Sequence, residues 1–450
     1  MRESYLWTDK FEFVSIRKMV IEKELNEHGW ASIEGVIHEK NRELYLQSLL
    51  EEQWVEILIR SEEGNMQILF KGLVFQAELE EGDVETVLKL QLVTGTYLMD
   101  KKEHYRIIQK DNYGIKDVLD VLGEGYQDYK YEMHEQADVM KGMLVQYKET
   151  DWIFIKRMLG EKGYCLIPDC YRSGVQYSVG VFEDVNTVID EKDFRLMKRG
   201  DERRHIVTSR EVYHLGEKVT FRNQPFYIYK MTTKYLNAEC IHEYHLLTKQ
   251  DLGIKKRNNK EFAGCSFPAV VRTVQRDKVQ VQFLDNEIAD GSMLGEIQKW
   301  LCFSTVYSTP GGAGWYCMPE IGDRVRIHFP SDKEEDAYAV SAVHLDNGKD
   351  RQNPECKSIK NRYGKEILLT PDSVVMTNNN GMKISLDDET GIMIQSNKDI
   401  NIIADGDMVL SSSKASVMIA GTESVAVNQG EAGILLDKDI LFNGREFRIQ

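Results

Sequence analysis

The sequence is poor in the residues and motifs that commonly carry chemistry. It has 10 histidines and 7 cysteines among 450 residues, and no two cysteines form a CxxC pair. It contains no HExxH, no P-loop, no GxGxxG and no GxSxG. We therefore nominate no catalytic residue, no cofactor-binding residue and no metal ligand, and we expect that the protein is not an enzyme.

Two weaker patterns do not change this expectation. His242 and His245 lie three residues apart, but an alternating strand would place them on opposite faces, which disfavours a shared metal ion. The pairs Asp387-Asp388 and Asp405-x-Asp407 fall between apolar segments. We expect these carboxylates to be solvated turn residues, with calcium binding as the alternative.

The sequence also lacks an excess of basic residues and any long apolar run. The formal net charge is −16, whereas a nucleic-acid partner requires a basic surface, so we do not expect one. No apolar stretch approaches the roughly 18 residues of a membrane span, and we expect no signal peptide. The scattered cysteines are expected to be buried, reduced thiols, with disulfides or a metal site as alternatives. The protein is thus predicted to be made in the cytoplasm.

What the sequence does contain is a repeat in its tail, residues 381–450. Apolar residues recur there in two parallel rows with a spacing of eight, interrupted once by an inserted residue, and turn-forming residues lie between them. The apolar–x–apolar unit is typical of a short strand with one buried face. The predicted core positions are Ile384, Leu386, Ile392, Ile394, Ile400, Ile402, Met408, Leu410, Val417, Ile419, Val425 and Val427, and the second row would continue to Leu435.

Such short strands cannot close a core within one chain of this length. Three identical chains wound around one axis would bury both apolar rows and pair the strand edges, so an intertwined trimeric β-helix is the favoured prediction. A single-chain solenoid and an open meander are the alternatives.

The rest of the chain is mainly β with a smaller α/β part. Residues 1–95 show alternating apolar segments, with a short helix expected at residues 41–50. Apolar residues at helical spacing predict helices near residues 115–122 and 150–160, with Thr150 as a cap. Residues 251–264 read as a polar linker, and the next 80 residues carry the five or six short strands of an OB-type barrel.

Three segments resemble one family. Residues 146–159 (QYKETDWIFIKRML) are similar to the signature of VgrG-type hub proteins of contractile injection machines. Residues 314–329 (GWYCMPEIGDRVRIHF), followed by an apolar strand at 337–343, resemble the OB segment of the family's spike, and the tail resembles its needle. A weaker echo is residues 68–74 (ILFKGLV), similar to the strand that closes the first hub barrel.

The resemblance implies a domain order. It comprises a first hub β-barrel (1–95), a helical insert with a second hub domain (96–250), a linker (251–264), an OB barrel (265–346), a connector (347–380) and a β-helix needle (381–450). The motif positions Asp151, Trp152, Trp315, Gly322 and Asp323 are expected to be structural. Asp151-Trp152 would start a helix and bury an indole, Gly322-Asp323 would form a tight turn, and Trp315 would lie in the barrel core or at a trimer interface.

The resemblance also implies partners and a function. A homotrimer would cap the inner tube at the baseplate, point its needle at the target cell envelope and pierce it on firing. A PAAR-like tip protein or an effector would sit near Asn443 to Gln450. Such a protein would be assembled in the cytoplasm and delivered out of the cell by the machine. The alternatives are a trimeric receptor-binding tail fibre and a β-helical polysaccharide-degrading enzyme.

Overall fold

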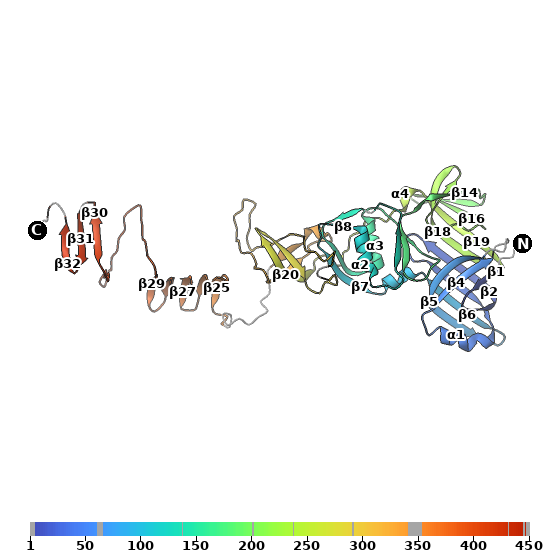
Figure 1. The fold of residues 1–450 in the computed structure, drawn as a ribbon, viewed down its shortest axis with the longest axis horizontal. Helices are drawn as coiled ribbons and strands as arrows, with labels where there is room; N and C mark the ends of the chain where they lie inside the picture. The colour runs from blue at the N-terminus through green and yellow to red at the C-terminus, as the bar shows by residue number, and fades with distance from the viewer. Residues whose placement is uncertain are drawn as a thin grey trace. The chain divides into compact units, whose positions relative to one another are not determined.

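The computed structural model describes residues 5–60, 66–136, 138–199, 202–236, 238–289, 292–340, 353–430, 432–443 and 446. The chain divides into two compact units, Met1–Val343 and His344–Gln450 (Figure 1). Each named sheet lies within one of these units.

The first unit begins with a strongly alternating set of antiparallel strands. In β4, for example, Val55, Ile57 and Ile59 are buried while the residues between them are partly exposed, which is the period of two that the sequence predicts. The short helix expected near residue 45 is present as α1. The elements are β1 (Tyr5–Thr8), β2 (Phe13–Glu24), β3 (Trp30–Ile37), η1 (Glu39–Asn41), α1 (Arg42–Ser48), β4 (Trp54–Arg60), β5 (Met66–Glu81) and β6 (Thr86–Val93).

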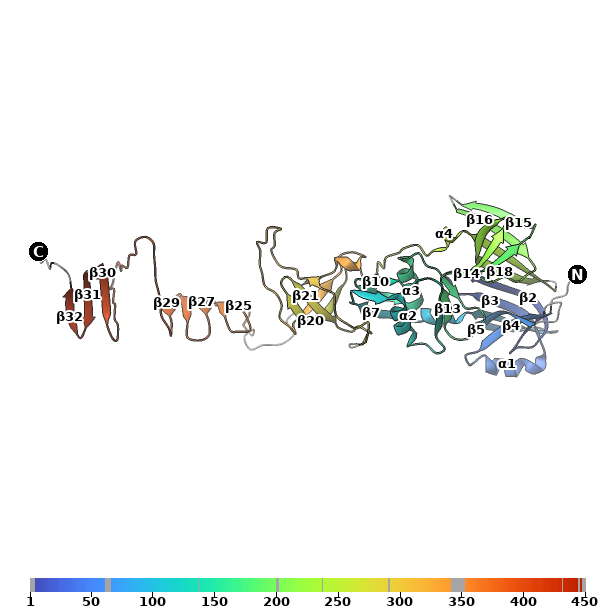
Figure 2. The same cartoon turned by 45° about the horizontal axis from the view of Figure 1, so that its top comes forward.

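The strands of the second predicted hub domain continue the same sheet. β2 pairs with β18 over Met19–Glu24 and Lys230–Tyr235, so one 12-stranded sheet runs β1-β4-β5-β6-β3-β2-β18-β19-β16-β15, with β17 on β18 and β14 on β17. Figure 2 shows these green strands beside the blue strands of residues 1–95. The added strands are β14 (Phe182–Ile189), β15 (Phe194–Arg199), β16 (Glu202–Ser209), β17 (Glu217–Phe221), β18 (Gln224–Leu236) and β19 (Glu239–Leu247), followed by α4 (Lys249–Leu252).

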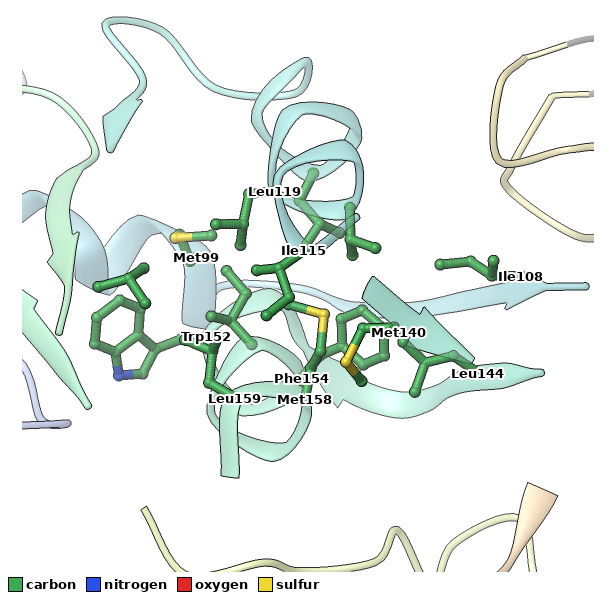
Figure 3. Close-up of a cluster of buried hydrophobic side chains, with 14 of the residues drawn as sticks. Met99, Ile108, Ile115, Leu119, Met140, Leu144, Trp152, Phe154, Met158 and Leu159 are labelled. Carbon is green, nitrogen blue, oxygen red and sulfur yellow. The ribbon is translucent and has the colours of Figure 1, made fainter. Parts of the chain in front are cut away.

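Both helices predicted between these strand sets are confirmed. They pack against each other, and Figure 3 shows Ile115 and Leu119 of one helix pointing toward Trp152 and Leu159 of the other. The hydroxyl of Thr150 accepts a hydrogen bond from the backbone N–H of Ile153 at 3.4 Å, as expected for a cap. The elements are η2 (Gly95–Asp100), β7 (Glu103–Ile108), β8 (Asn112–Gly114), α2 (Ile115–Gly123), β9 (Lys130–Met133), β10 (Val139–Lys141), β11 (Leu144–Thr150), α3 (Asp151–Gly160), β12 (Leu166–Pro168) and β13 (Gln176–Val179).

An OB-type barrel completes the first unit, as predicted. Its strands are β20 (Ser266–Gln275), β21 (Lys278–Phe283), β22 (Leu301–Cys302), β23 (Arg324–His328) and β24 (Tyr338–Val340), with η3 (Glu334–Asp336) before the last. They pair in the order β22-β21-β20-β23-β24, and a parallel bridge between Phe303 and Ala339 joins the two edges. The parallel contact between the third and fifth strands gives the five-stranded Greek-key closure of an OB fold.

The second unit consists of two antiparallel meanders. The first contains β25 (Lys357–Lys360), β26 (Glu366–Leu369), β27 (Ser373–Thr377), β28 (Lys383–Asp387) and β29 (Gly391–Gln395), each paired with the next. The second contains β30 (Val425–Gln429), β31 (Ala432–Asp437) and β32 (Asp439–Asn443). Residues 396–424 are described and form no strand. Both meanders are the orange and red arrows of Figure 1.

Three sequence-based expectations need correction. The predicted connector at 347–380 contains β25, β26 and β27. The sequence analysis did not extend the repeat to them because the spacing between Ile367 and Met376 is nine residues instead of eight. Leu435 lies on the face of β31 opposite the apolar row, because Val427 pairs with Ile434. Cysteines are buried at positions 165, 170 and 240, but Cys302 and Cys317 are exposed.

A buried ion triad joins α3 to the OB barrel. Arg157 donates from Nε to Glu149 Oε1 at 2.9 Å and from Nη1 to Glu334 Oε1 at 3.0 Å. Burial works against the charge of Arg157, but the hydrogen bond to Glu149 and the charges of both carboxylates outweigh it, so the pKa of Arg157 is raised. Burial also raises the pKa of the Glu334 carboxyl, against the opposing effect of Arg157. Glu149 is therefore the carboxylate that stabilises the arginine.

Substituting the two carboxylates should separate their contributions. We expect Glu149→Gln to destabilise the first unit by about 3 kcal/mol, because it leaves a buried guanidinium short of charge. We expect Glu334→Gln to cost less at pH 7, because burial raises the pKa of the Glu334 carboxyl and so offsets part of what its charge contributes to Arg157. Differential scanning calorimetry of both variants measures the effect.

The stability that Glu334 contributes should change with pH in a defined direction. A carboxyl whose folded pKa is raised contributes stability below its ordinary pKa of 4.5, and this contribution is lost as the pH rises through the folded pKa. The unfolding temperature of Glu334→Gln relative to the wild type should therefore fall as the pH is lowered from 7 toward 4. Equal costs of the two substitutions at pH 7 would contradict this account.

Candidate functional site

The predicted needle-core residues of the first meander share one face. The register pairs Ile384 with Ile394 and Leu386 with Ile392. The same register brings in apolar residues that the sequence analysis did not nominate, because they lie in the predicted connector. The apolar members of this face are Ile359, Ile367, Leu369, Val374, Met376, Ile384, Leu386, Ile392 and Ile394, and Lys357 lies on the same side at the end of β25, opposite Leu369.

This apolar face is uncovered in the single chain. All nine side chains are exposed, from 37% for Ile367 to 75% for Ile392. The opposite face is mixed and includes Val375, buried Ser385 and Met393. A continuous face of large aliphatic side chains on one side of a sheet is the pattern of an interior surface, since soluble proteins rarely leave such patches open to water.

Seven of the eight remaining predicted core residues are exposed, and Val425 is partly buried. Ile400, Ile402, Met408, Leu410, Val417 and Ile419 lie in residues 396–424, where the strands that the repeat predicts are not formed. In the second meander Val425 pairs with Leu436 and Val427 with Ile434, which gives an apolar face over β30 and β31. The alternation is thus confirmed in β28, β29 and β30, and nothing among the described residues of this unit buries it.

The chain does not form the single-chain solenoid that the sequence left open. Within residues 357–395 it forms an open meander, one sheet thick. Each strand holds only four or five residues. Among the described residues of this unit, nothing covers the apolar face.

The motif of residues 146–159 forms a buried polar cluster around Asp151. This carboxylate is fully buried and accepts hydrogen bonds from Gln146 Nε2 at 2.8 Å, from Tyr126 OH at 2.7 Å and from Arg106 Nη1. Burial raises the pKa of Tyr126, as does its hydrogen bond to Asp151, so the phenol stays a donor. With its lone pairs occupied, Asp151 is a structural anchor.

Trp152 is buried beside this cluster, as predicted. Its side chain is 0% exposed and lies 5.2 Å from the His28 ring and 5.7 Å from the Tyr177 ring, centroid to centroid. His104 Nδ1 lies 2.6 Å from Glu287 of the OB barrel, while its Nε2 lies 3.6 Å from Asp151. The 146–159 motif thus holds α3, the neighbouring strand β7 and the barrel together.

In the motif of residues 314–329, the turn at Gly322-Asp323 forms as predicted, but Trp315 does not lie in the barrel core. Gly322 adopts a φ of 96°, and Asp323 follows it into β23, where Val325 and Ile327 are buried. The left-handed φ explains the glycine. Trp315 is 49% exposed, so it is not a barrel-core residue, and its expected place at a trimer interface stays a prediction.

Neither a metal-binding group nor a membrane-spanning helix is found among the described residues. No group of three or more His, Cys, Asp or Glu side chains among them is arranged to hold a metal ion. His242 is buried in β19 while His245 is partly exposed on the other face, as the alternation predicts. Within the same residues, no helix has the length and apolar character needed to cross a membrane.

Comparisons with known proteins agree with this architecture. Residues 27–167 match the phage tail baseplate hub (GPD) family. No match to this chain is found among curated protein sequences.

Several solved structures share the fold at low sequence identity. An Escherichia coli component of the type VI secretion system, described as similar to the T4 bacteriophage tail proteins gp27 and gp5, is 10% identical, with a TM-score of 0.52 over 76% of this chain and 100% of its own. VgrG structures from a Francisella PdpA–VgrG complex and a lidless PdpA–VgrG complex are each 11% identical. Their TM-scores are 0.56 and 0.53, covering 85% and 84% of this chain and 76% and 93% of their own.

Residues 27–167 thus match the baseplate-hub family, and the chain shares its fold with the VgrG structures and with the type VI secretion component.

Proposed function

We propose that this protein is the non-enzymatic, trimeric hub-spike of a contractile injection machine. Residues 1–250 would cap the inner tube at the baseplate, and the C-terminal unit would form the needle that pierces a target envelope. The protein would be assembled in the cytoplasm and carried out of the cell by the machine.

One observation carries this proposal: the exposed apolar face of β25–β29 and its continuation in β30 and β31. Burying apolar area contributes about 25 cal/mol per Å². Nine large side chains on one small meander therefore give a strong drive to associate through that face. Identical chains can cover one another's apolar faces because each chain has the same pattern in the same register.

Residues 396–424 favour intertwining over simple face-to-face stacking. This described segment keeps the apolar–x–apolar pattern of the repeat but has no strand partner within its own chain. Backbone N–H and C=O groups need hydrogen-bond partners once they are buried. Strands contributed by two other chains around one axis would provide those partners and enclose both apolar rows.

A further partner is proposed for the needle end. The two similar VgrG structures are parts of complexes with PdpA. By analogy, a PAAR-like tip protein or an effector would bind the needle near residues 443–450. Most of these residues lie outside the described part of the chain.

A trimeric tail fibre and a β-helical polysaccharide-degrading enzyme are the competing functions. The fibre would share the apolar repeat, but it does not account for the baseplate-hub match at residues 27–167. The enzyme would need a groove with converging acidic or basic groups on the repeat. Release of reducing sugars from bacterial polysaccharides by the purified protein would favour the enzyme.

The first prediction concerns mass in solution. Full-length protein should elute as one species of three times the 52.0 kDa chain mass, because only association covers the apolar face. Size-exclusion chromatography with light scattering measures this mass directly. A monomer at micromolar concentration would contradict the proposal, and a dimer would replace the three-chain needle with a two-layer sandwich.

The second prediction uses two adjacent residues on opposite faces of β29. Ile392→Asp should dissociate the trimer, because it places a carboxylate where each chain would otherwise gain about 1.5–3 kcal/mol from a buried isoleucine. Met393→Asp is the matched control, since Met393 is also exposed, at 49%, but points to the other face.

Light scattering of both variants gives the readout. We expect a trimer for Met393→Asp and monomer for Ile392→Asp, with similar circular dichroism from the first unit in both. Trimers from both variants would show that the apolar face does not hold the assembly together.

A further inference from the structure

A cavity of about 340 Å³ lies within the first unit, and none of its lining residues belongs to the 146–159 or 314–329 motif. It is bounded by β2, by β12 with the loop that follows it, and by β14 and β17 with the loop that precedes β17. Its apolar walls include Ile167, Pro168, Phe182 and Leu215. The volume falls in the range of small-molecule sites, which is roughly 300–1,000 Å³.

A buried lysine forms part of this cavity. Lys23 on β2 is only 2% exposed, although lysine is almost never fully buried unless it is paired. Its Nζ donates to the backbone oxygen of Leu69 at 2.7 Å and to the hydroxyl of Tyr171 at 3.0 Å, and it lies 4.2 Å from the centre of the Tyr171 ring.

Both acceptors of Lys23 are neutral. No Asp or Glu of the described residues forms an ion pair with it. An ammonium has three donors, so one remains for a further acceptor. Burying a charge without a counter-ion is unfavourable, and an anion placed in the cavity would offset that cost.

A second donor lies beside Lys23. Because Lys23 donates to the Tyr171 oxygen, the Tyr171 hydroxyl can donate to Nδ1 of His214, which lies 3.0 Å away. Partial burial and the charge of Lys23 lower the pKa of His214, so the ring is neutral at pH 7. With Nδ1 accepting, the ring proton resides on Nε2, which leaves a second N–H donor on this cavity-lining side chain.

The acidic groups of the cavity already have partners. Asp169 accepts from Arg172 Nε at 2.6 Å and from the backbone N–H groups of Tyr171 and Arg172, and Glu132 lies 3.6 Å from Arg172. Glu217 has no ion pair among the described residues, but it accepts from Thr187 and from the backbone N–H of His214 at 2.9 Å. Lys23 and Glu217 are thus the two buried charged side chains of the cavity that form no ion pair among the described residues, and Lys23 is the cation of the two.

We propose that this cavity binds a small organic carboxylate with an apolar body. Its carboxylate would accept hydrogen bonds from Lys23 and His214, and its apolar part would contact Ile167, Phe182 and Leu215. The hub thus has a ligand site that is independent of the needle and of trimer assembly.

Benzoate is a suitable probe because it combines a carboxylate with a small apolar ring. Isothermal titration calorimetry on the full-length protein at pH 7 should detect its binding. Benzyl alcohol and benzylamine, which have the same ring but a neutral or cationic group, should bind roughly tenfold to a hundredfold more weakly, because they lose a hydrogen bond to a charged group.

Two variants test the assignment to Lys23. Lys23→Met keeps the shape of the side chain and should weaken benzoate binding by the same roughly tenfold to hundredfold factor while leaving the unfolding temperature unchanged or higher. Lys230→Met is the matched control, since it removes a lysine paired with Glu24 on the same sheet, and its benzoate affinity should equal that of the wild type.

A crystal structure of the wild-type protein with benzoate gives a readout that needs no variant. The carboxylate of the bound benzoate should lie within hydrogen-bond distance of Lys23 Nζ. The proposal is overturned by absence of benzoate binding at millimolar concentration, by tighter binding of benzylamine than of benzoate, or by unchanged affinity in Lys23→Met.

Discussion

The feature on which the C-terminal unit depends is an apolar sheet face that stays exposed in the single chain. Short strands joined by tight turns place every second residue on the same side, and in β25–β29 those residues are large and apolar except for Lys357, which lies opposite Leu369. Each strand of this meander holds only four or five residues. The proposal that copies of this chain associate rests on this face, because soluble proteins rarely leave such patches open to water.

The first unit differs from the second, because it buries its apolar residues within the chain. One continuous sheet carries the strands of both hub halves through the β2–β18 pairing, and the α2–α3 layer carries Trp152 in its core. Charged contacts then connect this layer to the OB barrel through the Arg157 triad and through His104, which lies between Asp151 and Glu287. These contacts hold the helical layer and the barrel in a defined relation.

The Lys23 cavity is lined by residues of the first unit. It arises where three groups of strands meet and none of them fills the space between them. Three residues that are far apart in the sequence contact one another there: Lys23, Tyr171 and His214. No pattern in the sequence predicts that they are neighbours.

The sequence by itself determined the strands of the repeat at residues 383–395 and 425–429, the two helices, the Thr150 cap and the OB-type barrel, because each follows from local periodicity, capping or turn chemistry over a few neighbouring residues. The repeat strands that it predicted within residues 396–424 are not formed in the single chain. It also placed Val325 and Ile327 in the barrel core and the two histidines of β19 on opposite faces. The β2–β18 pairing, the extension of the repeat back to Lys357, the exposure of Trp315, the Arg157 triad and the Lys23 cavity were decided only by the tertiary structure. Each of these depends on which distant segments lie side by side, and local patterns carry no information about that.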